Sequence, residues 1–172
     1  MTTTQTDAMW AAIEVERLRL ADDLAGLSEH QWTTQSQCDR WTVEEVAAHL
    51  VVPFEVSNLR LGLTMAKNRF SLTRTVNELT ARLHASTSRA ERIELLRANA
   101  ADRWTPPGLG PEIPLSEVIV HGQDIRRPLG LDHSIPAATI DLALNGISDL
   151  DTRADYARRI HGSVVEPVAD VA

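Results

Sequence analysis

The sequence has 172 residues, 43% of them hydrophobic and 24% charged, which is the composition of an ordinary soluble globular domain. Its formal net charge of −7, with dispersed Lys and Arg, argues against a duplex nucleic-acid binder, because such proteins cluster cations against phosphates. One cysteine excludes an internal disulfide, and no stretch has the length of a membrane span or the pattern of a signal peptide, so we expect a cytoplasmic protein.

The N-terminal half of the chain predicts two long helices. Apolar residues recur at helical spacing from Asp7, a candidate N-cap, to about Leu27. After a polar linker, Thr42 and Glu45 form a capping box, in which each side chain bonds a free backbone N–H of the other residue. We expect the helix that opens there to run to about Leu63.

The middle of the chain predicts two further helices and a loop. The pattern is helical over residues 73–104, with a break at residues 86–88. Ser88 and Glu91 form a second capping box, so one helix ends and another begins at this break. The following stretch, TPPGLGPEIP, is a loop because it is rich in Pro and Gly.

The C-terminal third predicts one buried helix and one less regular helix. The first begins near Pro114, which a first helical turn tolerates, and stops by Pro128. The second spans about residues 136–151 and can extend to Ile160, and residues 161–172 have the composition of a flexible tail. With no strand-like alternation, residues 1–160 predict one all-α bundle of four main antiparallel helices with additional short helices.

The helix that begins near Pro114 is apolar on nearly every side, but three polar residues interrupt this apolar pattern. Glu117, His121 and Asp124 lie on one stripe of it, at spacings i, i+4 and i+7. A buried carboxylate needs an arginine, a proton or a metal ion, so Glu117 and His121 predict either a mutual hydrogen bond or a pair of metal ligands. Asp124 has a simpler explanation, since its negative charge can offset the positive charge of Arg126 or Arg127 or interact with the helix end.

His49 is the second feature that needs a partner, because it shares an apolar stripe with Val46 and Pro53. Pro53 cannot bond the carbonyl of His49, so we expect the helix to be perturbed there. If the two helices are neighbours, His49 joins Glu117 and His121 as a third ligand and leaves a coordination position open, as in catalytic sites. The alternative is a core histidine paired with Glu45.

Other candidate residues have ordinary accounts as well as functional ones. Arg126 and Arg127 can bind a carboxylate, but they also complement a helix C-terminus. Arg60 lies on the His49 face, roughly 16 Å along the helix, where it can reach a bound ligand or simply be solvated. Cys38 follows no pattern of a reactive thiol and precedes the acidic Asp39. The remaining histidines have no partner spacing typical of ligands: His30, His84, His133 and His161.

Two sequence blocks resemble a known family. SQCDRWTVEEVAAHLV and, about 70 residues later, LSEVIVHGQDIRRPLG are similar to the N-terminal domain of mycothiol-dependent maleylpyruvate isomerase, within the DinB-like superfamily of metal-binding helical bundles. The opening WAAIEVERLRLADDLAGLSEHQW is similar as well, and the resemblance runs from about Met9 to Ile160. It implies a DinB-like four-helix bundle.

The resemblance also implies a site and a chemistry. The family's metal ligands fall on His49, Glu117 and His121, which in the family bind a divalent ion, usually zinc, although Ni²⁺, Fe²⁺ or Mn²⁺ suit the same ligands. The open positions serve water or the sulfur of a mycothiol-like thiol cosubstrate, which the ion makes a better nucleophile. Apart from the resemblance, Asp124, Arg126 and Arg60 are the candidate contacts of that thiol or of the substrate, beside the ordinary roles given above.

The expected function is therefore metal-dependent, thiol-using transfer to a small electrophile or its cis–trans isomerisation. The isomerase has a second domain, whereas this chain ends soon after Ile160, so the resemblance does not extend to maleylpyruvate specificity. The partners are a small thiol and an electrophile, without nucleic acid or membrane, and a homodimer is one compatible assembly. The alternatives are a non-catalytic metal-binding bundle with a stress-related role, and a plain bundle with a buried Glu–His pair.

Overall fold

The computed structural model describes residues 3–106, 108–131, 133–145, 147 and 150–160. Within these residues the ordered elements are helices, and the isolated bridge between Gln35 and Thr42 is the one extended pairing. The prediction of an all-α fold is confirmed for these residues. The helices are α1 (Thr3–Ala25), α2 (Glu29–Trp32), α3 (Val43–Leu50), α4 (Val52–Glu55), α5 (Asn58–Lys67), α6 (Leu72–Ser86), α7 (Arg89–Ala98), α8 (Glu112–Arg126), α9 (Ala137–Asn145) and α10 (Leu150–Ile160).

Helix α1 buries one stripe along the bundle. Met9, Ile13, Leu20 and Leu24 recur at spacings of four and seven and are almost completely buried. The predicted N-cap at Asp7 is wrong, because α1 already begins at Thr3 and includes that residue. The first turn carries no apolar residues, and so the hydrophobic pattern gave no signal for it.

The single helix expected from Thr42 to Leu63 is instead divided into α3, α4 and α5. The capping box is confirmed, since the backbone N–H of Thr42 donates to Glu45 Oε2 at 2.8 Å. The helix breaks beside His49, as the missing amide hydrogen of Pro53 predicts. It breaks again at Ser57, whose side chain caps α5.

The break predicted at residues 86–88 is confirmed between α6 and α7. The backbone N–H of Ser88 donates to Glu91 Oε2 at 2.6 Å, which completes the second capping box. Helix α2 lies inside the stretch expected to be a linker. It has its own capping box of Ser28 and Gln31, but with four residues it carries no hydrophobic period.

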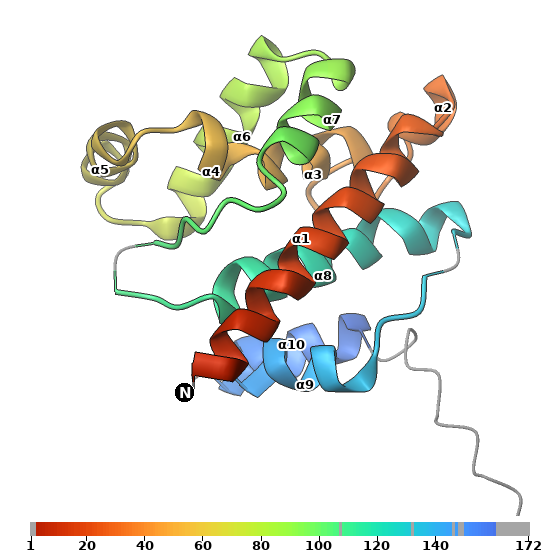
Figure 1. Cartoon of the computed structure of the whole chain (residues 1–172). Coiled ribbons are helices and arrows are strands. Elements are labelled where there is room, and N and C mark those ends of the chain that lie inside the picture. The colour runs from red at the N-terminus through yellow and green to blue at the C-terminus, as the bar shows by residue number, and fades with distance from the viewer. Residues whose placement is uncertain (1–2, 107, 132, 146, 148–149, 161–172) are drawn as a thin grey trace, which may run out of the picture.

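Helix α8 is the centre of the bundle and packs against α1, α3, α9 and α10. Figure 1 shows it between the α9–α10 pair and the group formed by α3, α6 and α7. Every residue from Val118 to Arg126 is buried, as the apolar pattern predicts. A 3₁₀ turn, Arg127–Leu129, then ends at Gly130, whose φ of 66° suits a residue without a side chain.

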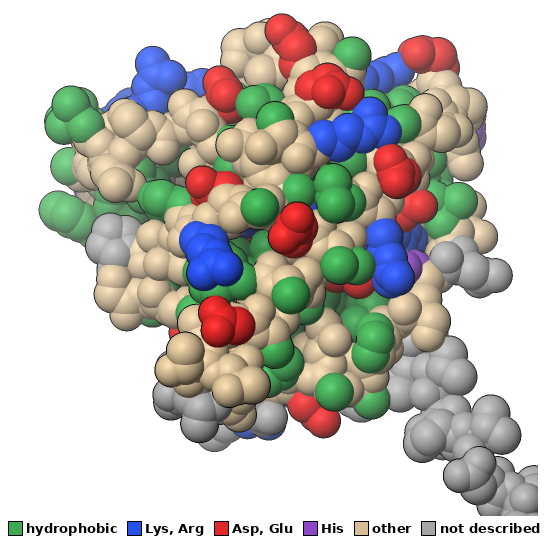
Figure 2. Space-filling view, in the orientation of Figure 1, with side chains coloured by type: hydrophobic (Ala, Val, Ile, Leu, Met, Phe, Trp, Pro, Cys, Tyr) green, Lys and Arg blue, Asp and Glu red, His purple; other side chains and the backbone are tan. Residues whose placement is uncertain are grey.

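The C-terminal helix is also two elements, α9 and α10, where the sequence pattern favoured one. The predicted tail, residues 161–172, lies outside the described residues. None of the described helices has the length and apolar composition to cross a membrane. On the face drawn in Figure 2, acidic and basic side chains are interspersed between apolar ones.

Candidate metal centre

The three predicted ligands lie together, on two helices that are distant in the sequence. His49 is in the last turn of α3, and Glu117 and His121 are one turn apart on α8. The Nε2 atoms of His49 and His121 lie 3.0 and 3.3 Å from the same oxygen, Glu117 Oε2. The candidate ligand atoms all lie within 4.8 Å of one another, and no other such group occurs among the described residues.

Both histidine rings are oriented through their second nitrogen. His121 Nδ1 lies 2.9 Å from Asp124 Oδ2, and His49 Nδ1 lies 3.4 Å from the hydroxyl oxygen of Thr80 on α6. Each Nε2 therefore points towards Glu117. Metal-binding histidines typically have this arrangement, in which a carboxylate or another oxygen accepts the other ring N–H. The pairing of His49 with Glu45 is wrong, because Glu45 caps the start of α3 instead.

Asp124 is completely buried and its carboxylate belongs to this cluster. It accepts hydrogen bonds from Arg159 on α10, with Nε 3.1 Å from Oδ1 and the Nη2 group in close contact with Oδ2. The prediction that Asp124 pairs with Arg126, Arg127 or the helix end is therefore wrong. Arg159 thus contacts Asp124, which in turn contacts His121. Because Asp124 is completely buried, a ligand in solution has no access to its carboxylate.

Tyr156 on α10 is a member of the site that sequence reasoning missed. Its hydroxyl donates to Glu117 Oε1 at 2.9 Å, while Oε2 faces the histidines. Arg159, one turn further along, was missed as well. Tyr and Arg three residues apart on a polar helix are a weak signal, and only the packing of α10 on α8 brings them here.

Trp41 forms one wall of the cluster. Its ring lies 4.9 Å from the ring of His49 and 6.4 Å from that of His121, between centroids. The same loop carries Cys38, which is partly buried. Burial, followed by the negative charge of Asp124, raises the pKa of the Cys38 thiol, so Cys38 is held as a neutral thiol.

The charges in the site follow from burial and from the hydrogen bonds that oppose it. Burial lowers the pKa of His49 and keeps its ring neutral. Burial also opposes the ionisation of Glu117, but the hydrogen bonds with His121 and His49 hold its pKa well below the usual value. For His121, hydrogen bonds with Asp124 and Glu117 overcome burial and raise the pKa to about 9. Without a metal, an imidazolium therefore lies between two carboxylates.

The donor set and its spacing suit a divalent ion. Two imidazole nitrogens bound at about 2.0 Å to a tetrahedral zinc ion lie about 3.3 Å from a carboxylate oxygen on the same ion. The two observed Nε2–Oε2 distances are close to that separation. The side chain of Glu117 is 31% exposed and that of His49 is 15% exposed, so the cluster is not fully enclosed by protein.

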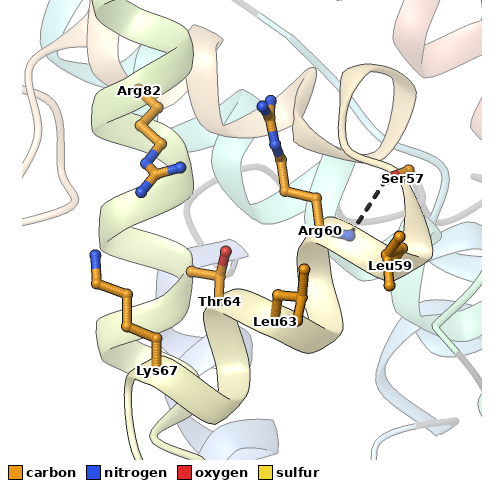
Figure 3. A pocket seen from close by; sticks show the side chains of 7 residues that line it. All are labelled: Ser57, Leu59, Arg60, Leu63, Thr64, Lys67 and Arg82. Carbon is orange, nitrogen blue, oxygen red and sulfur yellow. Dashed lines mark hydrogen bonds between the residues drawn. The ribbon is translucent and has the colours of Figure 1, made fainter.

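Arg126 and Arg60 lie elsewhere. Arg126 is 1% exposed, and its Nε donates to Asp23 Oδ2 on α1 at 2.6 Å, which leaves it no free face for a thiol. Arg60 is exposed on α5 and lines a cavity of about 430 Å³ (Figure 3), together with Ser57, Leu59, Leu63, Thr64, Lys67 and Arg82. His49, Glu117 and His121 do not line this cavity.

The histidines that were not expected to be ligands have other surroundings. His133 Nε2 lies 2.7 Å from the buried carboxylate of Glu16, and His84 Nε2 lies 3.8 Å from Glu44. His30 is exposed, and His161 lies outside the described residues.

Comparison with known protein families gives a match over most of the bundle. The model of a family described as the mycothiol maleylpyruvate isomerase N-terminal domain matches residues 13–126, about two thirds of the chain. The matched segment includes His49, Glu117, His121 and Asp124 and ends before Tyr156 and Arg159. No curated protein and no solved structure matches the chain.

Proposed function

The chain belongs to the mycothiol maleylpyruvate isomerase N-terminal domain family, within the DinB-like superfamily, and from this premise we propose that it is a metal-dependent enzyme. It uses a mycothiol-like thiol as a nucleophile towards small electrophiles, either for S-transfer or for cis–trans isomerisation. The observation that carries the proposal is the convergence of His49 and His121 on one oxygen of Glu117.

His49, Glu117 and His121 hold the ion in this proposal. Zinc is the first candidate, and Ni²⁺, Fe²⁺ and Mn²⁺ suit the same nitrogen and oxygen ligands. A bound divalent ion would lower the pKa of a thiol that coordinates to it and so supply a thiolate at neutral pH. Three protein ligands leave a position for that sulfur, in the manner of catalytic rather than structural zinc sites.

The rest of the site positions the ligands and limits access. Asp124 and Thr80 hold the second nitrogens of the two rings, and Trp41 covers one side of them. Asp124 thus takes a positioning role in place of the thiol contact predicted for it. In isomerisation, the sulfur forms a bond to one carbon of an activated cis double bond and the π electron pair moves onto the activating group. The remaining single bond rotates, and the pair then returns to restore the double bond while the sulfur leaves with its own electron pair. In S-transfer the new carbon–sulfur bond stays, and either a proton from water is taken up by the adjacent carbon or a leaving group departs with its electron pair.

The first experiment is metal analysis of the purified protein before and after chelation, followed by titration of the zinc-loaded form with mycothiol and with N-acetylcysteine. We expect about one tightly held ion per chain and thiol binding that requires it. A metal-binding protein without thiol affinity would support the non-catalytic alternative. Absence of tight metal binding would leave a helical bundle with a buried Glu–His pair and would refute the proposal.

Above pH 9, where His121 is neutral in both proteins, Asp124→Asn is expected to lower zinc affinity by about 10- to 100-fold without removing a ligand, because the carboxylate that orients His121 is lost. Competition with a chromophoric chelator measures this change. Asp141→Asn, which alters an exposed carboxylate on α9, is the matched control and should leave the affinity unchanged. Equal affinities of the two variants would show that Asp124 does not position His121 for metal binding.

A further inference from the structure

The two carboxylate oxygens of Glu117 have different partners. Oε2 faces His49 Nε2 at 3.0 Å and His121 Nε2 at 3.3 Å. Oε1 points the other way and accepts a hydrogen bond from the hydroxyl of Tyr156 at 2.9 Å. The side chain is thus held with one oxygen directed into the candidate metal centre and the other directed at α10.

This orientation determines how many coordination positions Glu117 can occupy. A carboxylate that offers one oxygen uses one position, whereas a carboxylate that turns both oxygens to the ion uses two. With two histidines present, the second arrangement would occupy the place that an incoming sulfur needs. We propose that Tyr156 is a positioning residue that holds Glu117 as a single-oxygen ligand and so keeps a position open for the thiol. This inference rests on the proposed metal-dependent function.

Helix α10 is built to hold Tyr156 in this place. The helix packs against α8 and α9, and the Tyr156 ring packs against the hydrophobic core. Arg159, one turn later, lies over the ring at 5.5 Å from its centroid and bonds the carboxylate of Asp124. Two residues of α10 therefore support two of the three ligands, Tyr156 through Glu117 and Arg159 through Asp124 and His121.

Tyr156 lies outside the segment that the family model matches, residues 13–126, so its role follows from contacts of this chain. A purely structural tyrosine would contribute to stability through the same hydrogen bond. The two roles differ in what the hydroxyl affects. A structural role changes the free energy of unfolding alone, whereas a positioning role also changes the coordination of the bound ion and its affinity for a thiol.

The test compares the wild-type protein with Tyr156→Phe after both are loaded with Co²⁺. Phenylalanine keeps the ring that packs beside Arg159 and removes only the hydroxyl. We expect weaker visible absorption of the cobalt in the variant, because ligand-field bands lose intensity as the coordination number rises. We also expect about tenfold weaker binding of mycothiol and N-acetylcysteine, the size of an effect associated with one hydrogen bond to a charged group. The matched control, Arg158→Gln, removes an exposed ion pair of the same helix and should match the wild type.

The outcomes separate this inference from the proposed function. A wild-type protein that does not bind cobalt refutes the metal site itself. A wild type that binds cobalt, together with a Tyr156→Phe variant of identical spectrum and thiol affinity, overturns the role of Tyr156 and leaves the metal site standing.

A measurement on the wild type covers the case in which Tyr156→Phe does not fold. Tyr156 is the only tyrosine of the sequence, so ring-labelled tyrosine gives one set of NMR signals. In the zinc-loaded protein we expect its hydroxyl proton to exchange slowly with water, because the hydrogen bond to Glu117 persists. Exchange as fast as that of an exposed tyrosine would overturn the inference.

Discussion

Alanine at any one of His49, Glu117 or His121 is expected to lower zinc affinity by at least about a hundredfold. Each substitution removes one of three protein ligands, and zinc sites with four ligands have apparent binding free energies of about 10–16 kcal/mol at neutral pH, or about 3 kcal/mol for each ligand. Metal analysis after dialysis against a weak chelator, combined with competition titration, measures the loss. Circular dichroism should show an intact bundle in each variant.

Histidines outside the cluster provide the control for this prediction. His84→Ala and His133→Ala should bind zinc with the wild-type stoichiometry and affinity, because neither side chain belongs to the group of ligand atoms. His133→Ala removes the hydrogen bond to the buried Glu16, which Arg19 and Arg126 contact only at 3.6 and 3.8 Å, so its thermal stability should fall while its zinc affinity does not. Normal zinc binding in all three ligand variants would refute the assignment of the site.

Local signals in the sequence were sufficient to place two of the three candidate ligands side by side, and the family resemblance was needed to predict the set of three. The i, i+4 spacing of Glu117 and His121 on a helix with an apolar pattern places both on one face, whatever the helix packs against. The two capping boxes similarly marked the starts of α3 and α7, because the bonds that define them lie within four residues. The meeting of His49 with Glu117 needed the additional premise that α3 and α8 are neighbours.

The supporting residues could not be predicted in this way. Tyr156 and Arg159 contact residues 39 and 35 positions away, through the packing of one helix on another. No local pattern encodes that register, and the resemblance to the family was strongest in two blocks that end before α10. Arg126 shows the converse error: guanidinium chemistry suits a carboxylate ligand, but the fold turns this side chain towards Asp23 on α1.

Zinc affinity is expected to rise about tenfold for each pH unit between about pH 7 and 9 and then to level off. In the metal-free protein, hydrogen bonds with Asp124 and Glu117 raise the pKa of His121 to about 9 against the effect of burial. His121 is therefore protonated at pH 7, whereas a metal ligand must be a neutral imidazole, so each ion that binds displaces about one proton. Competition titrations in non-coordinating buffers measure the slope, and an affinity that does not change between pH 7 and 9 would contradict the expectation.

The raised pKa of His121 also predicts how the stability of the metal-free protein changes with pH. A pKa raised from its ordinary value of 6.5 to about 9 contributes stability below about pH 6.5. That contribution is lost as the pH rises through 9, so the free energy of unfolding of the metal-free protein should fall over this range.

Asp124→Asn should move two pH-dependent changes to lower pH, namely the levelling of zinc affinity and the fall in stability of the metal-free protein. The reason is that the substitution removes one of the two carboxylates that hold the proton on His121. Its zinc affinity should therefore level off earlier and at a lower value than that of the wild type. Calorimetry in buffers of different ionisation enthalpy should give fewer protons released per zinc ion at pH 8 in this variant. Equal proton release in the two proteins would mean that Asp124 does not control the charge of His121.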